Sequence, residues 1–374
     1  MKVIILKNNL REAIAIAERA IGDNTNLPIL KNFLIRAEHN ILHLSATNLE
    51  LGIHATTSAK VMTPGTVTVS ASLLSSVVSN ISSERLDIEQ KNTLLEIRAD
   101  NYEVSLPLMP SEDYPALPTV EDKKECLTIA SALMNDALGR VASAVQFSEL
   151  RPEISGVYFD LEPDQLILAG TDIFRLAEKK IPKSLIESNF EKGITNIIPL
   201  RTIQELIRVS SKRDQEIKWY FGENLVLVAG ENWEIISRLI NGFFPDYMGL
   251  GIIPKEFQTE IELEREELMN ALKLSGAVSQ SQLVSEVKLV VSAGKKNLEI
   301  FSAEKSFGKT RAMLPAKISG SPTEIYFNWR YLWDGLKGFT DKTITLALNG
   351  GEKAALLKSK DTSYIYILMP AKDS

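Results

Sequence analysis

The chain repeats one pattern of strands and helices three times along its 374 residues. In each copy, a strand with alternating apolar residues ends in a small residue followed by an amide or an acid. These pairs are Thr47-Asn48, Thr171-Asp172 and Ala303-Glu304. A β-branched or aromatic strand then runs directly into a helix, and Val69, Ile198 and Phe327 in these strands follow one another at intervals of 129 residues. The sequence therefore predicts three diverged copies of one unit.

Each copy carries two stretches with apolar residues at helical spacing, one at its start and one after the β-branched strand. The predicted helices span residues 9–21, 72–83, 130–145, 199–213, 265–279 and 328–339. The remaining segments read as hairpins, so the predicted fold class is α+β, with two helices on antiparallel sheets in each copy. Proline-containing linkers at 107–118 and 243–254 place the three domains at 1–118, 123–249 and 255–374.

Composition narrows the class of protein. No apolar run approaches the roughly 20 residues that a membrane-spanning helix needs, and the N-terminus lacks the cleavage site of a signal peptide. Cys126 is the only cysteine, which rules out an intrachain disulfide and fits a reducing compartment. We therefore expect a cytoplasmic protein.

Charge is distributed unevenly. The whole chain carries a net charge of −6, which taken alone argues against a nucleic-acid partner. The six predicted helices together carry 11 basic and 7 acidic residues, a net charge of +4, so the rest of the chain carries −10. The net charge of the whole chain therefore hides a local excess of positive charge on the helices and does not by itself decide against a nucleic-acid partner.

Six segments, in order along the whole chain, carry a resemblance to a known family. They are NLPILKNFLI (26–35), LSATNLEL (44–51), GTDIFRLA (170–177), NGFFPDY (241–247), FNWRYLWDGL (327–336) and IYILMP (365–370). In these segments the chain resembles the beta subunit of bacterial DNA polymerase III, the sliding clamp. The resemblance implies a DNA-clamp fold: a head-to-tail homodimer closed into a ring around duplex DNA, with helices lining the hole and a continuous sheet outside.

The resemblance also implies a function in DNA replication, as a processivity factor within the DNA polymerase III complex. Such a ring tethers the replicative polymerase and recruits polymerase and clamp-loader subunits and other proteins with clamp-binding motifs. The resemblance implies no active site, and together with the residues themselves it leads us to expect no cofactor, no metal and no membrane partner.

A peptide-binding groove between the second and third domains is a further implication of the resemblance. It would consist mainly of apolar residues with one cation, as expected for a groove that takes an extended apolar motif. The residues are Ile154, Thr171, Ile173, Phe174, Arg175, Leu176, Pro245, Leu250, Ile367 and Met369. Ile154, Leu176, Ile367 and Met369 could equally be ordinary domain core. The family has Gly-His where this chain has Ile173-Phe174, which could narrow the groove or change its peptide preference.

Two more sets of residues follow from the predicted ring. Cations on the predicted helices would face DNA: Arg11, Arg140, Arg201, Arg208, Lys212, Arg213, Lys273, Arg330 and Lys337. These charges could instead simply solvate exposed helix faces. The resemblance places the dimer interface at Val104, Leu106, Ala277 and Val278.

Two other classes of function stay open. Gly308-Lys309-Thr310 looks like the end of a phosphate loop, but Ala303 stands where the leading glycine belongs, and His39 and His43 lack a third metal ligand, so an enzyme is disfavoured. A clamp-like scaffold that binds proteins without serving replication is compatible with the sequence.

Overall fold

The computed structural model describes residues 1–22, 27–211, 215–249, 251, 253–254, 256–278, 286–292, 294, 296–304 and 308–371, without the side chains of Val278, Ala303 and Glu304. The chain folds into two compact units. Unit 1 comprises Met1–Ala132, Glu187–Phe190 and Glu205–Leu239, and unit 2 comprises Leu133–Ile186, Glu191–Gln204 and Ile240–Ser374. The predicted middle domain is thus divided between the units, because its two groups of strands pair with different neighbours.

Unit 1 is built on one 14-stranded sheet. In spatial order its strands are β14 (Glu187–Ser188), β10 (Leu127–Ala130), β16 (Glu216–Phe221), β17 (Leu225–Ala229), β18 (Trp233–Arg238), β4 (Leu51–Ser58), β3 (Ile41–Thr47), β2 (Asn32–Glu38), β6 (Gly65–Ser70), β9 (Tyr102–Met109), β8 (Leu94–Ala99), β7 (Arg85–Lys91), β1 (Lys2–Leu6) and β5 (Lys60–Thr63). Each pairing within this sheet is antiparallel, in agreement with the predicted class.

Unit 2 is built on one 12-stranded sheet, also antiparallel. In spatial order its strands are β15 (Ile194–Pro199), β11 (Gly156–Leu161), β12 (Gln165–Thr171), β13 (Arg175–Pro182), β26 (Tyr364–Leu368), β25 (Ala355–Lys358), β24 (Thr343–Leu348), β19 (Thr259–Glu264), β22 (Gly308–Gly320), β21 (Asn297–Glu304), β20 (Glu286–Val291) and β23 (Thr323–Asn328).

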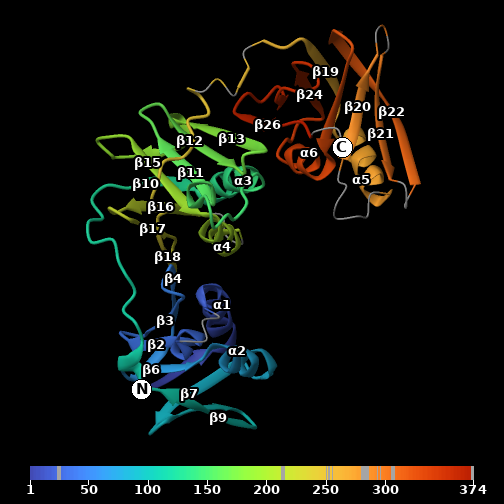
Figure 1. Cartoon of the computed structure of the whole chain (residues 1–374). Coiled ribbons are helices and arrows are strands. Elements are labelled where there is room, and N and C mark those ends of the chain that lie inside the picture. The colour runs from blue at the N-terminus through green and yellow to red at the C-terminus, as the bar shows by residue number, and fades with distance from the viewer. Residues whose placement is uncertain are drawn as a thin grey trace. The chain divides into compact units, whose positions relative to one another are not determined.

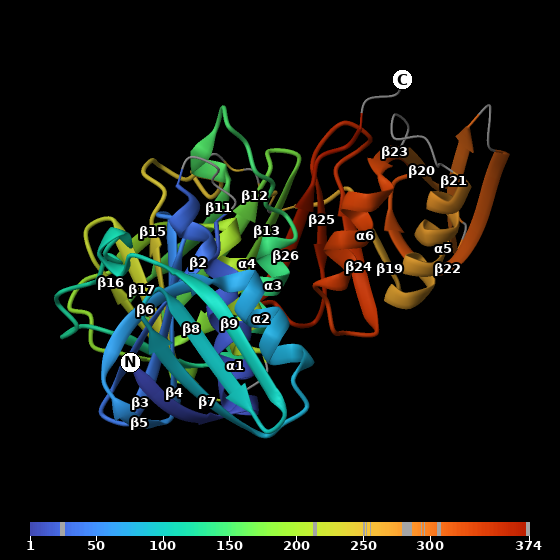
Figure 2. The ribbon, with the colours of Figure 1, turned by 90° about the horizontal axis from the view of Figure 1, so that it is seen from below.

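Six α-helices occur in the described part of the chain, two in each sequence repeat. They are α1 (Lys7–Ala17), α2 (Ala71–Asn80), α3 (Ser131–Ala142), α4 (Leu200–Ser210), α5 (Arg265–Val278) and α6 (Trp329–Lys337). α1 and α2 lie side by side, as do α5 and α6 (Figures 1 and 2). Each observed helix coincides with a predicted one, which confirms the helical half of the repeat. Side chains cap two of them: Ser70 accepts from the backbone N–H of Leu73, and Asn328 accepts from that of Arg330.

Neighbouring repeats are joined by strand pairing in one common register. In unit 1, Ser237 of β18 lies opposite Leu51 of β4. In unit 2, Leu368 of β26 lies opposite Arg175 of β13. Leu51 and Arg175 each come four residues after the repeated threonine, Thr47 or Thr171, so the last strand of a repeat pairs with the same position of the preceding repeat. We call each such strand pair a junction ladder.

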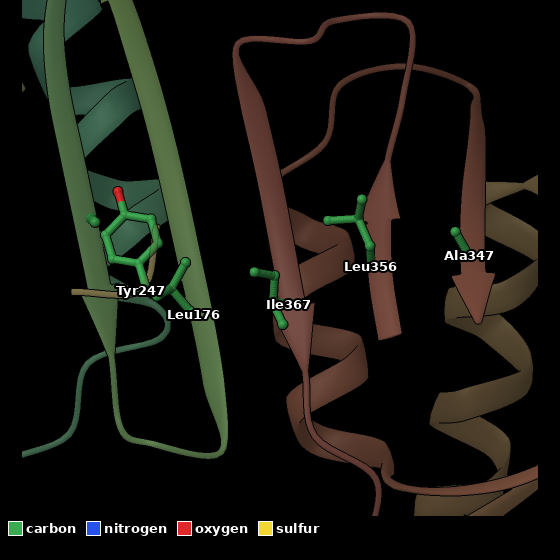
Figure 3. Packing of buried hydrophobic residues seen from close by; sticks show 6 residues of the cluster. Leu176, Tyr247, Ala347, Leu356 and Ile367 are labelled. Atoms are coloured by element: carbon green, nitrogen blue, oxygen red, sulfur yellow. The ribbon is translucent and has the colours of Figure 1, made fainter. Parts of the chain in front are cut away.

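The junction ladder of unit 2 is backed by an apolar core drawn from both repeats. Leu176 of β13 and Tyr247 of the linker meet Ile367 of β26, Leu356 of β25 and Ala347 of β24 (Figure 3). At about 25 cal/mol per Å² of apolar surface removed from water, such a cluster stabilises the junction beyond what backbone pairing alone provides.

Two stacked histidines lie beside the junction ladder of unit 1. The rings of His43 on β3 and His54 on β4 have centroids 5.2 Å apart, and Nδ1 of His43 lies 3.2 Å from Nε2 of His54. Nδ1 of His54 lies 2.9 Å from Oγ of Ser45, and Glu234 of β18 lies opposite His54. Burial lowers the pKa of both imidazoles, and each positive charge would further oppose the other.

The histidine pair predicts acid sensitivity. Because the folded-state pKa values lie below those of the unfolded chain, the unfolded state binds more protons as the pH falls below about 6.5. The free energy of unfolding should therefore decrease between pH 7.5 and the folded-state pKa values. Replacing both residues (His43→Gln with His54→Gln) should flatten this part of the profile, as measured by urea denaturation at a series of pH values.

His39, which is exposed, provides the control. His39→Asn should change the slope of stability against pH far less than the double variant does, because His39 is the weakest of the influences on the pKa of His43 and asparagine tolerates the positive φ of this position. An unchanged slope in the double variant would show that this half-buried histidine pair does not carry the acid sensitivity.

Candidate functional site

The conformation of the turn between β12 and β13 is fixed by hydrogen bonds from two of its own side chains. Oγ1 of Thr171 donates to the carbonyl oxygen of Arg175 (2.6 Å) and accepts from the N–H of Ile173 (3.1 Å). Oδ1 of Asp172 accepts from the N–H groups of Phe174 (3.0 Å) and Arg175 (3.1 Å). These bonds hold Ile173 at a φ of 73°. The apolar side chains of Ile173 and Phe174 consequently point outward and are 51% and 54% exposed.

The end of β26 lies against this turn. The N–H of Met369 donates to the carbonyl oxygen of Phe174 (2.8 Å), and the Met369 side chain is 41% exposed. We call Ile173, Phe174 and Met369 the turn patch. It brings together residues that are nearly 200 positions apart in the sequence, as the proposed groove requires.

Other residues of the predicted groove lie beneath the surface. Ile154, Leu176 and Ile367 are all buried, and the last two belong to the core of Figure 3. Pro245 is half-buried, and Leu250 lies outside the described residues. The accessible part of the site is therefore the turn patch, supported from below by apolar core.

The linker that carries Pro245 is fixed to the second repeat. The hydroxyl of Tyr247 donates to Oε2 of buried Glu178 (2.5 Å), and Phe244 stacks on Tyr158 with ring centroids 4.9 Å apart. Burial, followed by the charge of Glu178, raises the pKa of Tyr247 well above its ordinary value. Tyr247 therefore stays protonated and keeps donating, which holds the linker at Tyr247 against β13.

Arg175 supplies the only cation among the predicted groove residues, but its charge is already engaged. Its Nε donates to Oδ2 of Asp172 (2.8 Å), and its Nη1 donates to Oδ2 of Asp334 on α6 (3.0 Å). The guanidinium also lies 4.3 Å from the ring centroid of Tyr331. Arg175 thus ties the turn to α6 instead of offering a free charge at the surface.

The predicted DNA-facing cations differ in their exposure and in whether they form ion pairs. Arg11 on α1 and Lys273 on α5 are exposed, and neither forms an ion pair within the described residues. Arg201 on α4 is also exposed, and Arg330 on α6 lies over the ring of Trp329.

Three other predicted cations have carboxylate partners. Arg140 pairs with Asp136 and is only 12% exposed, Arg208 pairs with Glu205, and Lys337 pairs with Asp334. Their charge is partly neutralised, which weakens attraction to phosphate. The predicted DNA contacts Lys212 and Arg213 lie outside the described residues.

The predicted dimer residues lie on β9 and at the end of α5. Val104 is half-buried, Leu106 is buried and Ala277 is exposed. The side chain of Val278 lies outside the described part. Among the residues described, no three His, Cys, Asp or Glu side chains gather closely enough to hold a metal ion, and no helix is long and apolar enough to cross a membrane.

Family models match almost the entire chain, one to each repeat. They are the N-terminal domain of the DNA polymerase III beta subunit at residues 1–118, the central domain at 128–246 and the C-terminal domain at 251–372. The chain belongs to the DNA polymerase III beta subunit family, the sliding clamps.

Full-length relatives agree with this assignment. The chain is 28% identical to the beta sliding clamp of Synechococcus elongatus over 99% of both chains, and 25% identical to that of Bacillus subtilis over 100% of both. Among solved structures, the Bacillus subtilis DNA polymerase sliding clamp shares its fold with a TM-score of 0.94 at 24% identity, and the Thermotoga maritima beta subunit with 0.90 at 22%, each over 100% of both chains.

The turn patch contains a backbone conformation that is strained for its residue. Ile173 has a φ of 73°, a left-handed conformation that β-branched residues rarely adopt. The first repeat has the same turn: Oγ1 of Thr47 donates to the carbonyl oxygen of Leu51, and Leu49 has a φ of 79°. The turn geometry is therefore common to both repeats, and each repeat places a bulky apolar residue, Leu49 or Ile173, at the left-handed position.

Three strongly exposed apolar residues near Ile154 were not predicted from the sequence. Phe147, Leu150 and Phe243 are 72%, 94% and 94% exposed. The 147–150 loop is tied to the segment after Ile154, because the N–H of Ser148 donates to Oγ of Ser155 (2.9 Å). Their apolar character was the available signal, but exposure in a loop depends on tertiary packing that periodicity does not report.

Replacing Ile173 by glycine should stabilise the chain. Relief of the left-handed strain outweighs the extra freedom of glycine in the unfolded state, so we expect a gain of roughly 0.5–1 kcal/mol. The measurement is the free energy of unfolding from urea titration. Phe174→Gly is the matched control, because Phe174 lacks a positive φ and should lose stability instead. Equal losses in both variants would show that Ile173 is unstrained.

Proposed function

We propose that this chain is a replicative DNA sliding clamp: two copies pair head to tail into a ring around duplex DNA, tether the polymerase, and recruit partners through the turn patch. The observation that carries the ring is a third junction that one chain leaves incomplete. Each of the other two junctions is a ladder between the last strand of one repeat and the strand after the turn of the preceding repeat.

The unmatched strands are β9, the last strand of the first repeat, and β22, which follows the hairpin turn of the third. β9 pairs with β8 along its length and with β6 only through Leu108 and Met109. β22 pairs with β21 over residues 308–315 and with β19 over 316–320. Within the described residues, the 102–107 part of β9 and the 308–315 part of β22 therefore each have one unpaired edge.

Burial distinguishes these strands from their counterparts. β18 and β26 are mostly buried, whereas most side chains of β9 and of the 308–315 segment are exposed or half-buried. Exposed strand edges readily pair with another chain. Two identical head-to-tail joints between two copies close a ring.

The register of the missing ladder follows from the two existing ones. In unit 2, Lys179 lies opposite Tyr364. Leu176 pairs with Thr171 across its hairpin as Lys309 pairs with Ala303, so Leu176 and Lys309 are equivalent positions. Three residues further on, Lys179 is therefore equivalent to Ala312. Tyr102 begins β9 as Tyr364 begins β26, so Tyr102 should face Ala312 of the second copy. Glu103 then falls opposite Arg311, which is a favourable pairing of opposite charges, and Ser105 falls opposite Lys309.

Retention on DNA by such a ring depends on topology and needs only weak contacts. Each neutralised phosphate adds salt-sensitive affinity that would slow sliding. The free cations Arg11 and Lys273 alongside the paired Arg140, Arg208 and Lys337 give the mild positive charge that this mode of binding requires.

A substitution that breaks the third junction should abolish both the dimeric ring and its retention on circular DNA. Val104→Arg places a cation beside Arg311 and Lys309 of the other copy. We expect the particle mass, measured by light scattering, to fall from twice 41.5 kDa to 41.5 kDa. After loading onto a nicked circular plasmid, the unmodified ring should remain bound until the DNA is linearised, and the variant should not be retained.

Val61→Arg is the matched control, because Val61 is a half-buried valine on β5, the outermost strand of the same sheet. It should stay dimeric and be retained. A monomeric unmodified chain, or retention that survives linearisation, would contradict the topological mechanism.

Partner recruitment is proposed for the turn patch because it presents apolar side chains at the edge of a buried apolar core. Truncating Phe174 or Met369 to alanine should weaken binding of a Gln-Leu-Ser-Leu-Phe peptide about tenfold each, since burying a large apolar side chain contributes about 1.5–3 kcal/mol. Fluorescence polarisation gives the affinity. Leu185→Ala, at a residue that is 54% exposed elsewhere in unit 2, should leave it unchanged. Unchanged affinity in both patch variants would place the peptide site elsewhere.

A further inference from the structure

One carboxylate joins the turn patch to a helix proposed to face DNA. Oδ2 of Asp334 accepts from Nη1 of Arg175 (3.0 Å), and Oδ1 accepts from Nζ of Lys337 (2.9 Å). Asp334 and Lys337 both lie on α6, whereas Arg175 begins β13, 159 residues earlier in the chain. Two cations therefore share a single anion.

The first cation, Arg175, is buried and linked to the turn patch by hydrogen bonds. The Arg175 side chain is 9% exposed and also bonded to Asp172, whose other oxygen holds the N–H of Phe174. A buried guanidinium that loses a carboxylate partner is strongly destabilised, so the strength of its bond to Asp334 bears directly on the geometry of the turn.

The Lys337 end is open to solvent. Its side chain is 46% exposed, and its Nζ lies 3.5 Å from the ring centroid of Trp333. An ion pair of this exposure contributes little to stability, so a phosphate can displace Asp334 from Lys337 at little cost.

We propose that Asp334 couples phosphate binding at Lys337 to peptide binding at the turn patch. This inference rests on the proposed function of both surfaces. When a phosphate engages Lys337, Asp334 no longer shares its charge and the repulsion between Lys337 and Arg175 is screened. The bond from Arg175 to Asp334 strengthens, the turn is held more firmly in its binding conformation, and the patch binds peptide more tightly. By thermodynamic reciprocity, bound peptide raises the affinity for DNA by the same factor.

The experiment measures the affinity of a fluorescent Gln-Leu-Ser-Leu-Phe peptide for the intact dimer, without DNA and with a saturating short duplex at low salt. DNA should tighten peptide binding about fivefold, the lower end of typical coupling between two sites. Asp334→Asn should bind peptide more weakly than the unmodified chain and show no increase with DNA.

Lys337→Met distinguishes coupling from simple loss of structure. Because it frees Asp334 permanently, it should bind peptide without DNA as tightly as the unmodified chain does with DNA, and adding DNA should change nothing further. Lys353→Met is the matched control: it also removes an exposed lysine of unit 2, but Lys353 is neither among the predicted DNA-facing residues nor in the Asp334 network, so the fivefold increase should persist.

The inference is overturned if DNA leaves the peptide affinity of the unmodified dimer unchanged, or if Asp334→Asn or Lys337→Met responds to DNA as the unmodified dimer does. Failure of the proposed function itself has a different signature, because the unmodified dimer would then bind no peptide, or no DNA, in either half of the experiment.

Discussion

Strand pairing between repeats is the interaction on which the rest of this structure depends. Backbone N–H and C=O groups must be paired when they are buried. Neighbouring repeats meet this requirement by pairing their edge strands in one register, β18 with β4 and β26 with β13. The core behind β13 and β26 then becomes continuous, with Leu176 and Ile367 as direct cross-strand neighbours. A series of repeats joined in this way leaves one strand edge without a partner in its first repeat and one in its last repeat. The proposed assembly would therefore use the same strand pairing that makes the fold.

The junction ladder also determines where a docking surface can form. The turn before β13 meets the end of β26 because the two strands are paired, and the hydrogen bond from Met369 to Phe174 extends that pairing by one step. The first repeat builds the same turn from Thr47 and Asn48, but there Glu50 occupies the position of Phe174. Equivalent backbone geometry therefore supports an apolar patch at one junction and a charged surface at the other.

Local pattern was sufficient to predict the period and the helices, because helical spacing and capping depend on residues within a turn of one another. It could not establish which apolar residues of the proposed groove are buried. Leu176 and Ile367 are alternating strand residues like many others, and only the pairing of segments nearly 200 positions apart places them in one core. The partners of Arg175 and the contact of His43 with His54 were missed for the same reason: a sequence reports charge and type, whereas ion pairs depend on three-dimensional proximity.

The partners of Arg175 show why the chemistry of a site cannot be inferred from residue type alone. As a cation amid apolar residues, it suggests a surface that attracts acidic peptides. Its guanidinium is instead enclosed by Asp172, Asp334 and the ring of Tyr331, so its charge is balanced before any ligand arrives. What remains at the surface is apolar, so the specificity of the proposed peptide site would come mainly from the shape of Ile173, Phe174 and Met369. Under the proposed coupling, charge would act indirectly, through the strength with which Asp334 holds the turn that presents those side chains.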